Sequence, residues 1–561
     1  MLGNSYLLAI LHYVLCASAA IYNWNVGWIT ENPDGLLPRP VIAINGQWPP
    51  PTLSANVGDT ITINLKNNLG NETTGLHFHG LFQNGTNSMD GPTQVNQPGT
   101  YWYHSHNRGQ YPDGFRGALI IHDPSNPYAG QYDQEEVLVL SDWYHKQIPD
   151  LIPKFLSTTA NPSGAEPVPD SAILNDKATT SFSITPGKTY MFRIINVSNF
   201  ASFLLKFDQH QMAIIEVDGV YTVKQSTDLI YITAGQRYSV LITAKATAPG
   251  RNYAFVGAMD PNMFDCNPCP GVPLNATGYL IYDATKPPPT KEPTFPSYTS
   301  GFYDDFSLVP YDKQALFEPV TKRITFNVES GVFFNQNRFA INNITYVEPK
   351  VPTLFTVLDA GNQATNPVIY GEYANPYIVS HNDVVEIVVN NGDSGGHPIH
   401  MHGHNFQMVE RSPPYNNPHK APGTPTTTPP ATPIRRDVMK VQASGYLVYR
   451  FRADNPDKSL HPLPSPPLQK PQLTPLARVW AFHCHIDWHL TAGFFATIIE
   501  APLALQAQSV PADQIQVCKD QKLPYQGNAA GNTQNYTDLT GANDAPPVHN
   551  TGAYCGTCQP S

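Results

Sequence analysis

The chain has 561 residues, of which 14% are charged, and a formal net charge of −11 at pH 7. This length exceeds one ordinary domain and predicts two to four. The negative charge argues against nucleic acid or an anionic membrane surface as a partner. The 55 Pro, 39 Gly and 29 Tyr residues, with few charges, favour an all-β fold over helical bundles.

Residues 1–20 have the pattern of a secretory signal peptide. An apolar core at 7–11 precedes the small residues of 17–20, which form a cleavage site. No later apolar run is long enough to span a bilayer, so a secreted, extracellular protein without a membrane anchor is expected. Asn-x-Ser/Thr acceptors then predict N-glycans at Asn71, Asn84, Asn196, Asn275, Asn343 and Asn535.

Three stretches of the mature chain have strand patterns bounded by Gly, Asn and Pro. Alternating or apolar runs occur at 60–65 and 117–122 in the first stretch (21–130), at 190–196 and 238–243 in the second (131–295), and at 384–390 in the third (296–561). A proline-rich joint at 286–293 closes the second stretch. Short strands at this spacing are typical of β-sandwiches.

Four histidine pairs share the spacing i, i+2. Successive side chains of a strand point to opposite faces, so each pair presents two imidazoles on one face. Eight such ligands suffice for a cluster of several ions and are too many for one zinc ion. The pairs are His77/His79, His104/His106, His400/His402 and His483/His485.

Cys484 lies between the last two histidines and therefore faces the other way. A helical turn after His485 would bring His489 back to the metal of the cysteine, and His397 remains as a further ligand. A thiolate with imidazoles and a weak axial position suits copper that cycles between two oxidation states. The alternative is a reduced core cysteine beside zinc-like neighbours.

The four pairs, together with the runs at 45–49, 99–106 and 435–437, resemble those of the multicopper oxidases, specifically fungal laccases and the ferroxidases close to them. The resemblance implies an all-β chain of three cupredoxin-like Greek-key β-sandwich domains, at 21–130, 131–295 and 296–561. It also implies four copper ions. One is a type 1 ion on His397, Cys484 and His489, one a type 2 ion on His77 and His400, and two are a type 3 pair on His79, His104, His106, His402, His483 and His485.

The resemblance implies that a reductant gives single electrons through His489 and that dioxygen, the second substrate, is reduced to water. Phe494 occupies the axial position, ten residues after Cys484, and cannot coordinate copper, which should raise the potential. Asp90 and Asp487 are the candidate proton donors. A turn-forming Asp and a solvated acid are the respective alternatives.

Carboxylates near the type 1 histidines bear on which reductant the enzyme oxidises. Iron-oxidising relatives use carboxylates beside the type 1 histidines, and Asp393 matches one of them. The expected glutamate before the turn at 186–190 is replaced by Ser183, which weakens binding of a hard ion. We therefore favour a monomeric laccase that oxidises phenols and aromatic amines. A ferroxidase acting on Fe(II) is the alternative, since 527–541 looks ferroxidase-like, and a non-catalytic copper-binding protein or inactive gene product is the third.

The chain departs from the family pattern at two places. Near 95–96 a strand segment of the first domain is missing, and 457–478 form an unusual proline-rich insert, which together suggest a wrongly assembled gene. Of seven cysteines, Cys266/Cys269 and Cys555/Cys558 can pair locally. Cys518 is then left alone; in laccases its counterpart bonds to the cysteine of the missing turn.

Overall fold

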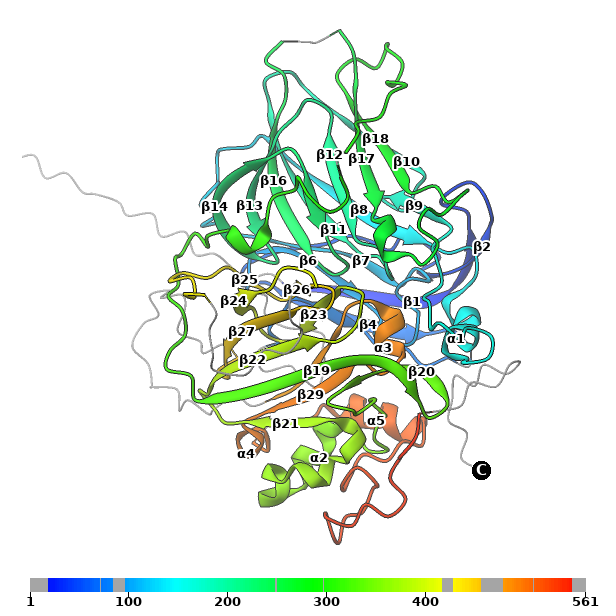
Figure 1. Ribbon diagram of the computed structural model, residues 1–561, viewed down its shortest axis with the longest axis vertical. Helices are drawn as coiled ribbons and strands as arrows, with labels where there is room; N and C mark the ends of the chain where they lie inside the picture. Colours follow the sequence, from blue (N-terminus) through cyan, green and yellow to red (C-terminus); the bar gives the residue numbers. More distant parts are fainter. Residues whose placement is uncertain are drawn as a thin grey trace, which may run out of the picture.

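The computed structural model describes residues 19–70, 72–83, 96–247, 250–295, 297–415, 427–455, 478–507 and 509–546. Strands dominate and form six sheets, which confirms the all-β prediction. Asp90, most of the insert at 457–478 and the pair Cys555/Cys558 lie outside the described residues. In Figure 1 the sheets of the second stretch lie at the top and those of the third at the bottom, with the blue first-stretch strands between them in this view.

The first stretch forms a three-stranded sheet, β2-β1-β4, and a four-stranded sheet, β3-β7-β6-β5. Trp24, Leu53, Phe78 and Leu119 belong to the core between them. The strand runs expected at 60–65 and 117–122 are confirmed as β4 and β7. The bounds are β1 Ala19–Glu31, β2 Arg39–Ile44, β3 Leu53–Asn56, β4 Thr60–Asn67, β5 His77–His79, β6 Gly99–His104 and β7 Arg116–His122.

The second stretch forms a six-stranded sheet, β14-β13-β16-β11-β8-β9, and a five-stranded sheet, β10-β18-β17-β12-β15. The runs expected at 190–196 and 238–243 are confirmed as β11 and β16. The bounds are β8 Gln134–Trp143, α1 Ile148–Leu156, β9 Ser171–Leu174, β10 Thr179–Ser183, β11 Thr189–Asn196, β12 Phe203–Phe207, β13 Met212–Val217, β14 Val220–Thr227, β15 Ile230–Ile232, β16 Arg237–Thr243, β17 Tyr253–Met259, η2 Pro261–Met263 and β18 Asn275–Ile281.

The third stretch forms the sheets β20-β19-β22-β27-β24-β25 and β21-β29-β28-β23-β26, and the run at 384–390 is confirmed as β22. One apolar core runs through both the second and the third stretch. The bounds are η3 Asp305–Ser307, β19 Lys322–Phe333, β20 Gln336–Ile341, α2 Thr353–Asp359, η4 Gly361–Thr365, η5 Pro367–Tyr370, η6 Glu372–Ala374, β21 Pro376–Val379, β22 Val384–Asn391, β23 His397–Met401, β24 Phe406–Arg411, β25 Arg435–Arg436, β26 Val438–Val441, β27 Tyr446–Arg452, β28 Arg478–Cys484, α3 Asp487–Thr491, β29 Phe495–Glu500, α4 Pro502–Leu505 and α5 Ala512–Asp520.

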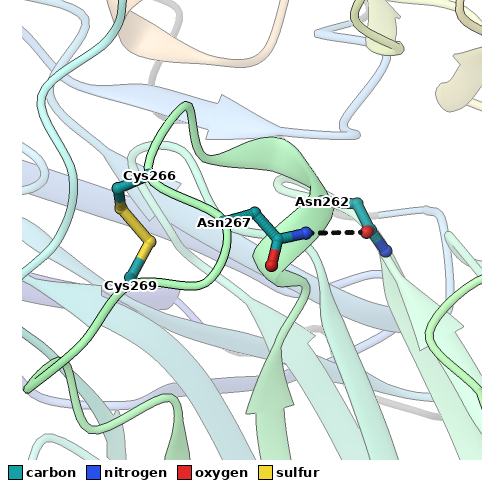
Figure 2. Close-up of a disulfide and its surroundings, with 4 residues drawn as sticks. All are labelled: Asn262, Cys266, Asn267 and Cys269. Atoms are coloured by element: carbon teal, nitrogen blue, oxygen red, sulfur yellow. Dashed lines mark hydrogen bonds between the residues drawn. A yellow bond between two sulfur atoms is a disulfide. The ribbon is translucent and has the colours of Figure 1, made fainter.

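The cysteines follow the local pairing expected from the sequence where the structure describes them. Cys266 and Cys269 form a disulfide in the loop after η2, where the side-chain amide of Asn267 donates to Asn262 (Figure 2). Cys518 is buried and free. A disulfide partner for Cys518 is thus absent among the described cysteines.

The asparagines predicted to carry N-glycans differ in their exposure to solvent. The Asn196 side chain is fully buried, and its amide donates to the backbone carbonyls of Ala201 and Ile232, so glycosylation at Asn196 is incompatible with this fold. Asn275, Asn343 and Asn535 are exposed, whereas Asn71 and Asn84 lie outside the described residues. In the described part of the chain, helices both apolar and long enough to cross a membrane are absent.

Candidate metal centres

Cys484, His397 and His489 meet at one buried point of the third stretch. The Cys484 sulfur lies 3.4 Å from His489 Nδ1 and 3.8 Å from His397 Nδ1, and the two nitrogens are 3.0 Å apart. This triangle of one sulfur and two imidazole nitrogens is the arrangement that blue-copper sites use. We call it the Cys484 site.

The local chain explains how residues from three places converge. β23 pairs with β28, which sets His397 beside the strand end that carries Cys484. The chain then turns into α3, which returns His489 to the sulfur. The expected helical turn after His485 is therefore confirmed.

The thiol and the axial position also fit a copper ion. Burial by itself raises the pKa of Cys484, but the charges of His489 and His397 outweigh it and lower the pKa to about 7, which favours the thiolate that binds metal. Phe494 is fully buried, and its ring centre lies 5.3 Å from that of His397. Phenylalanine supplies no donor atom at that position.

Two carboxylates lie on the outer side of this site. Glu166 Oε1 lies 2.7 Å from His489 Nε2, and Asp393 Oδ2 lies 3.3 Å from His397 Nε2. Both histidines are almost fully buried, whereas the Glu166 and Asp393 side chains keep 18% and 17% of their surface exposed. Each imidazole thus connects the interior Nδ1 to a carboxylate that solvent reaches.

The eight paired histidines form a second cluster between the first and third stretches. Their ligand atoms gather in three groups, each within 4.8 Å: His77, His79 and His400; His79, His104 and His485; and His106, His402 and His483. His77 and His79 lie on β5 and His104 on β6, whereas β23 carries His400 and β28 carries His483. The predicted alternation across Cys484 is confirmed, because Cys484 and its two neighbouring histidines serve different groups.

Hydrogen bonds determine which imidazole nitrogen faces each group. The Nδ1 atoms of His104, His400 and His483 contact backbone carbonyls of Ser105, Asp437 and Cys484 at 3.0, 2.8 and 2.8 Å. The Nε2 atoms of His104 and His400 are buried without a hydrogen-bond partner in the described structure. These are the atoms that a metal ion would bind.

Burial keeps seven of the eight histidines of this cluster neutral, as metal ligands must be. Burial lowers the pKa of His483 to about 4. Burial, assisted by the neighbouring imidazoles, also holds the pKa well below its usual value in His79, His104, His106, His400, His402 and His485. Neutral histidines packed around unpaired nitrogens fit several copper ions.

Asp487 borders this cluster, as the sequence analysis expected of a proton donor. It lines a small cavity with His104, His106, Tyr111, His483 and His485. Its side chain is 5% exposed, and Oδ2 is buried without a hydrogen-bond partner in the described structure. Burial, with the nearby Asp113, raises the pKa of Asp487 to about 7. The alternative of a solvated acid is therefore wrong.

Comparison with known proteins identifies the family. Profiles described as multicopper oxidase match residues 25–99 and 92–126, 134–283 and 346–504. An iron transport multicopper oxidase (fetC) of Epichloe festucae is 46% identical over 95% of this chain and 85% of the relative. The chain belongs to the multicopper oxidase family.

The multicopper oxidase structures extend the likeness to three dimensions. The crystal structure of Fet3p, described as a multicopper oxidase that functions in iron import, matches with a TM-score of 0.85 and 38% identity, covering 95% of this chain and all of that one. A laccase from Botrytis aclada matches less well, at 0.75 and 28%, over 90% and 91% of the chains. The six sheets are those of three cupredoxin domains.

Other similar sequences also carry the name iron transport multicopper oxidase. The iron transport multicopper oxidase FET3 of Saccharomyces cerevisiae is 40% identical over 94% of this chain and 83% of the relative. These relatives favour the ferroxidase alternative over the laccase reading.

Ser183 does not take the place of an iron-binding carboxylate beside the Cys484 site, so the weakened iron binding expected from it is wrong. Ser183 ends β10 on the surface, and the carboxylate beside His489 comes from Glu166 instead. Glu166 lies in the loop before β9, 323 residues from His489 in the sequence, and nothing in that loop signals the contact. Only the packing of the second domain against the third brings the two together.

Proposed function

We propose that this multicopper oxidase is a ferroxidase, which oxidises Fe(II) to Fe(III) and passes the electrons to dioxygen. Four ferrous ions, one dioxygen molecule and four protons then give four ferric ions and two water molecules. The main support is one observation: a partly exposed carboxylate lies against the outer nitrogen of each histidine of the Cys484 site.

Carboxylates suit both the ion and the reaction. Fe(II) is held by oxygen ligands, and two negative charges favour the ferric product over the ferrous substrate because its charge is higher. Hydrogen bonding and the charge of His397 hold the pKa of Asp393 below its usual value against the effect of burial, so it stays charged. Asp393 also accepts a hydrogen bond from Ser330 at 2.6 Å, which fixes its direction.

The path of the electron from bound iron to His489 is short. An electron leaving iron at Glu166 enters the imidazole of His489 across a 2.7 Å contact. Copper, when bound, supplies the chemistry of accepting and passing on single electrons. Cys484 is covalently joined to His483 and His485, which belong to two of the three groups of the histidine cluster.

We assign the copper ligands as the sequence predicts. His397, Cys484 and His489 would hold the type 1 ion, His77 and His400 the type 2 ion, and the other six histidines the type 3 pair. Asp487 would hold and release protons on the cluster side. The completeness of this ligand set argues against a simple copper carrier, which needs the type 1 ligands alone.

The test compares two reductants on the copper-loaded protein. We expect kcat/KM for Fe(II) to exceed that for a phenol such as 2,6-dimethoxyphenol. In Glu166→Ala with Asp393→Ala the KM for Fe(II) should rise at least tenfold, because the ion loses its oxygen ligands, while phenol oxidation changes less than threefold. Steady-state oxygen uptake measures both.

A matched variant separates charge from general damage. Glu372 is an acidic residue in η6 that contacts neither histidine, and Glu372→Ala should leave both rates unchanged. A higher kcat/KM for the phenol than for Fe(II) in the unaltered protein would contradict the ferroxidase proposal and support the laccase hypothesis. Absence of oxygen uptake with either reductant would leave a copper-binding or inactive protein.

A further inference from the structure

A groove on the outer face of the first domain has no part in the copper chemistry. It is a shallow, solvent-open hollow of about 600 Å³ over the sheet β2-β1-β4, whose strands are labelled in Figure 1. Its lining is uncharged and consists of Asn23, Asn25, Gly27, Trp28, Ile29, Asn45, Gly46 and Asn68. This volume is within the range of small-ligand sites.

The asparagines reach the groove because of strand geometry. Asn23, Asn25 and Gly27 alternate along β1 and share one face, while Trp24 and Val26 point into the core. Asn64 lies beside Asn23 in the parallel register of β1 and β4. Exposed amides therefore gather on one surface of a rigid sheet.

Mutual hydrogen bonds hold these amides in place. Asn45 Oδ1 accepts from the backbone N–H of Asn25 at 2.8 Å and from its side-chain amide at 3.1 Å. Asn45 Nδ2 donates to the backbone carbonyl of Asn23 at 3.0 Å, and Asn64 Nδ2 donates to Asn23 Oδ1 at 2.9 Å. Groups fixed before binding lose little conformational entropy when a ligand arrives.

Other amide atoms remain available. In the described structure, hydrogen-bond partners are absent for Nδ2 of Asn23, for Oδ1 of Asn25 and for both amide atoms of Asn68. An amide offers a donor and an acceptor in one plane, which matches neighbouring hydroxyl groups of a sugar. Gly27 leaves the floor open, since a Cβ there would meet Asn68 at 3.9 Å.

We propose that this asparagine groove binds a neutral, hydroxyl-rich oligosaccharide. A charged ligand would find no counter-charge among the lining residues. An added peptide strand would need unpaired backbone groups, but the groove lies over β1, which is paired on both sides by β2 and β4. Trp28 borders the groove but, like Trp24 and Val26, packs against the core, so the amides supply the binding surface.

The test titrates the copper-loaded protein with laminarihexaose, chitohexaose and mannohexaose, which represent three sugar chemistries, in a calorimeter. We expect at least one to bind with a Kd of about 1 mM or lower. Asn23→Ala with Asn68→Ala should weaken that binding at least tenfold. Fe(II) oxidation should stay unchanged, because the groove residues are distinct from those of the Cys484 site and its carboxylates.

A second variant fills the groove and keeps its amides. Gly27 has an ordinary backbone conformation and an open Cβ position, so Gly27→Val is compatible with the strand and should also weaken binding at least tenfold. Asn362→Ala, at an exposed asparagine of η4, is the control and should bind as the unaltered protein does. Failure of all three sugars to bind, or a loss smaller than tenfold in both groove variants, overturns the proposal.

Discussion

At the scale of single residues, Asp437 holds two ligands of the histidine cluster in place. Its Oδ1 lies 3.2 Å from His79 Nε2, which leaves His79 Nδ1 for the cluster, and its backbone carbonyl contacts His400 Nδ1 at 2.8 Å. The guanidinium of Arg237 donates to both carboxylate oxygens at 2.6 Å. The run at 435–437, which carries part of the family resemblance, therefore also supplies the carboxylate that orients these histidines.

Asp437→Asn should therefore weaken both folding and copper binding. Removing one partner of this buried ion pair leaves Arg237 with only the more distant carboxylate of Asp218, at 3.6 Å, at a cost of about 3 kcal/mol. We expect copper analysis to show loss from the histidine cluster while the visible absorption of the Cys484 site persists. Asp312→Asn, which removes an exposed partner of Arg435, should cost less than about 1 kcal/mol. Full copper content in Asp437→Asn would contradict the orienting role.

The buried carboxyl group of Glu500 should make the stability of the folded chain depend on pH. It is fully buried at the end of β29, accepts a hydrogen bond from Trp480 Nε1 at 3.0 Å, and burial raises its pKa to about 8. The folded chain thus keeps the proton that the unfolded chain loses near pH 4.5, so this group lowers stability as pH rises from about 4.5 to about 8. The limiting slope is about 1.4 kcal/mol per pH unit.

Glu500→Gln should remove this slope because glutamine stays neutral and can still accept from Trp480. Thermal unfolding at pH 5 and pH 8 measures the effect, and the variant should lose less stability between the two than the unaltered protein does. An identical pH dependence in both proteins would show that Glu500 ionises normally.

At the scale of elements, the end of β28 and the helix α3 distribute ligands between the two copper regions. The sharp return after α3 depends on Gly493, which has φ +100°, a conformation that favours glycine. A Cβ at Gly493 would lie 2.6 Å from Thr345 Cγ2. On the adjoining α3, the ring centre of His489 lies 4.3 Å from that of Phe339.

Gly493→Ala should accordingly displace α3 and disturb the Cys484 site. We expect a loss of about 1–3 kcal/mol in stability and a changed visible absorption spectrum of the copper-loaded protein. Gly331→Ala is the matched control, because a Cβ on this exposed glycine of β19 meets only Phe333 at an ordinary 3.6 Å. An unchanged spectrum in Gly493→Ala would mean that the helix tolerates the shift.

At the scale of the whole molecule, the histidine cluster, the Cys484 site and ion pairs join all three domains. The histidine cluster takes its ligands from the first and third domains. The second domain contributes Glu166 to the Cys484 site and Arg237 to Asp437, and Arg436 of the third pairs with Asp218 of the second at 2.7 Å. Bound copper is therefore expected to act as a cross-link.

Removing copper should lower the melting temperature, because the cross-link between domains is then lost. A ligand present at a hundred times its Kd stabilises the folded state by about 2.7 kcal/mol for each site. Calorimetry before and after chelation should show a lower Tm, recovered on adding copper but not magnesium, which prefers oxygen ligands. An unchanged Tm after complete removal would show that the histidine cluster adds nothing to domain cohesion.

The sequence determined the all-β class, the strand runs, the Cys266/Cys269 disulfide and the spacing of the histidine pairs. These features depend on short-range rules: alternation places His483 and His485 opposite Cys484, and a helical turn returns His489. The side-chain period of a strand is fixed, so spacing alone carries that information.

Only the tertiary structure decided which groups surround those ligands. Glu166 reaches His489 across 323 residues, Arg237 reaches Asp437 across 200, and the buried state of Asn196 depends on the packed second domain. Contacts between domains leave no periodic trace in the sequence, because they depend on how rigid sandwiches pack. For that reason spacing predicted which histidines gather around Cys484 and in the cluster, whereas the carboxylates that favour iron as the substrate required the folded chain.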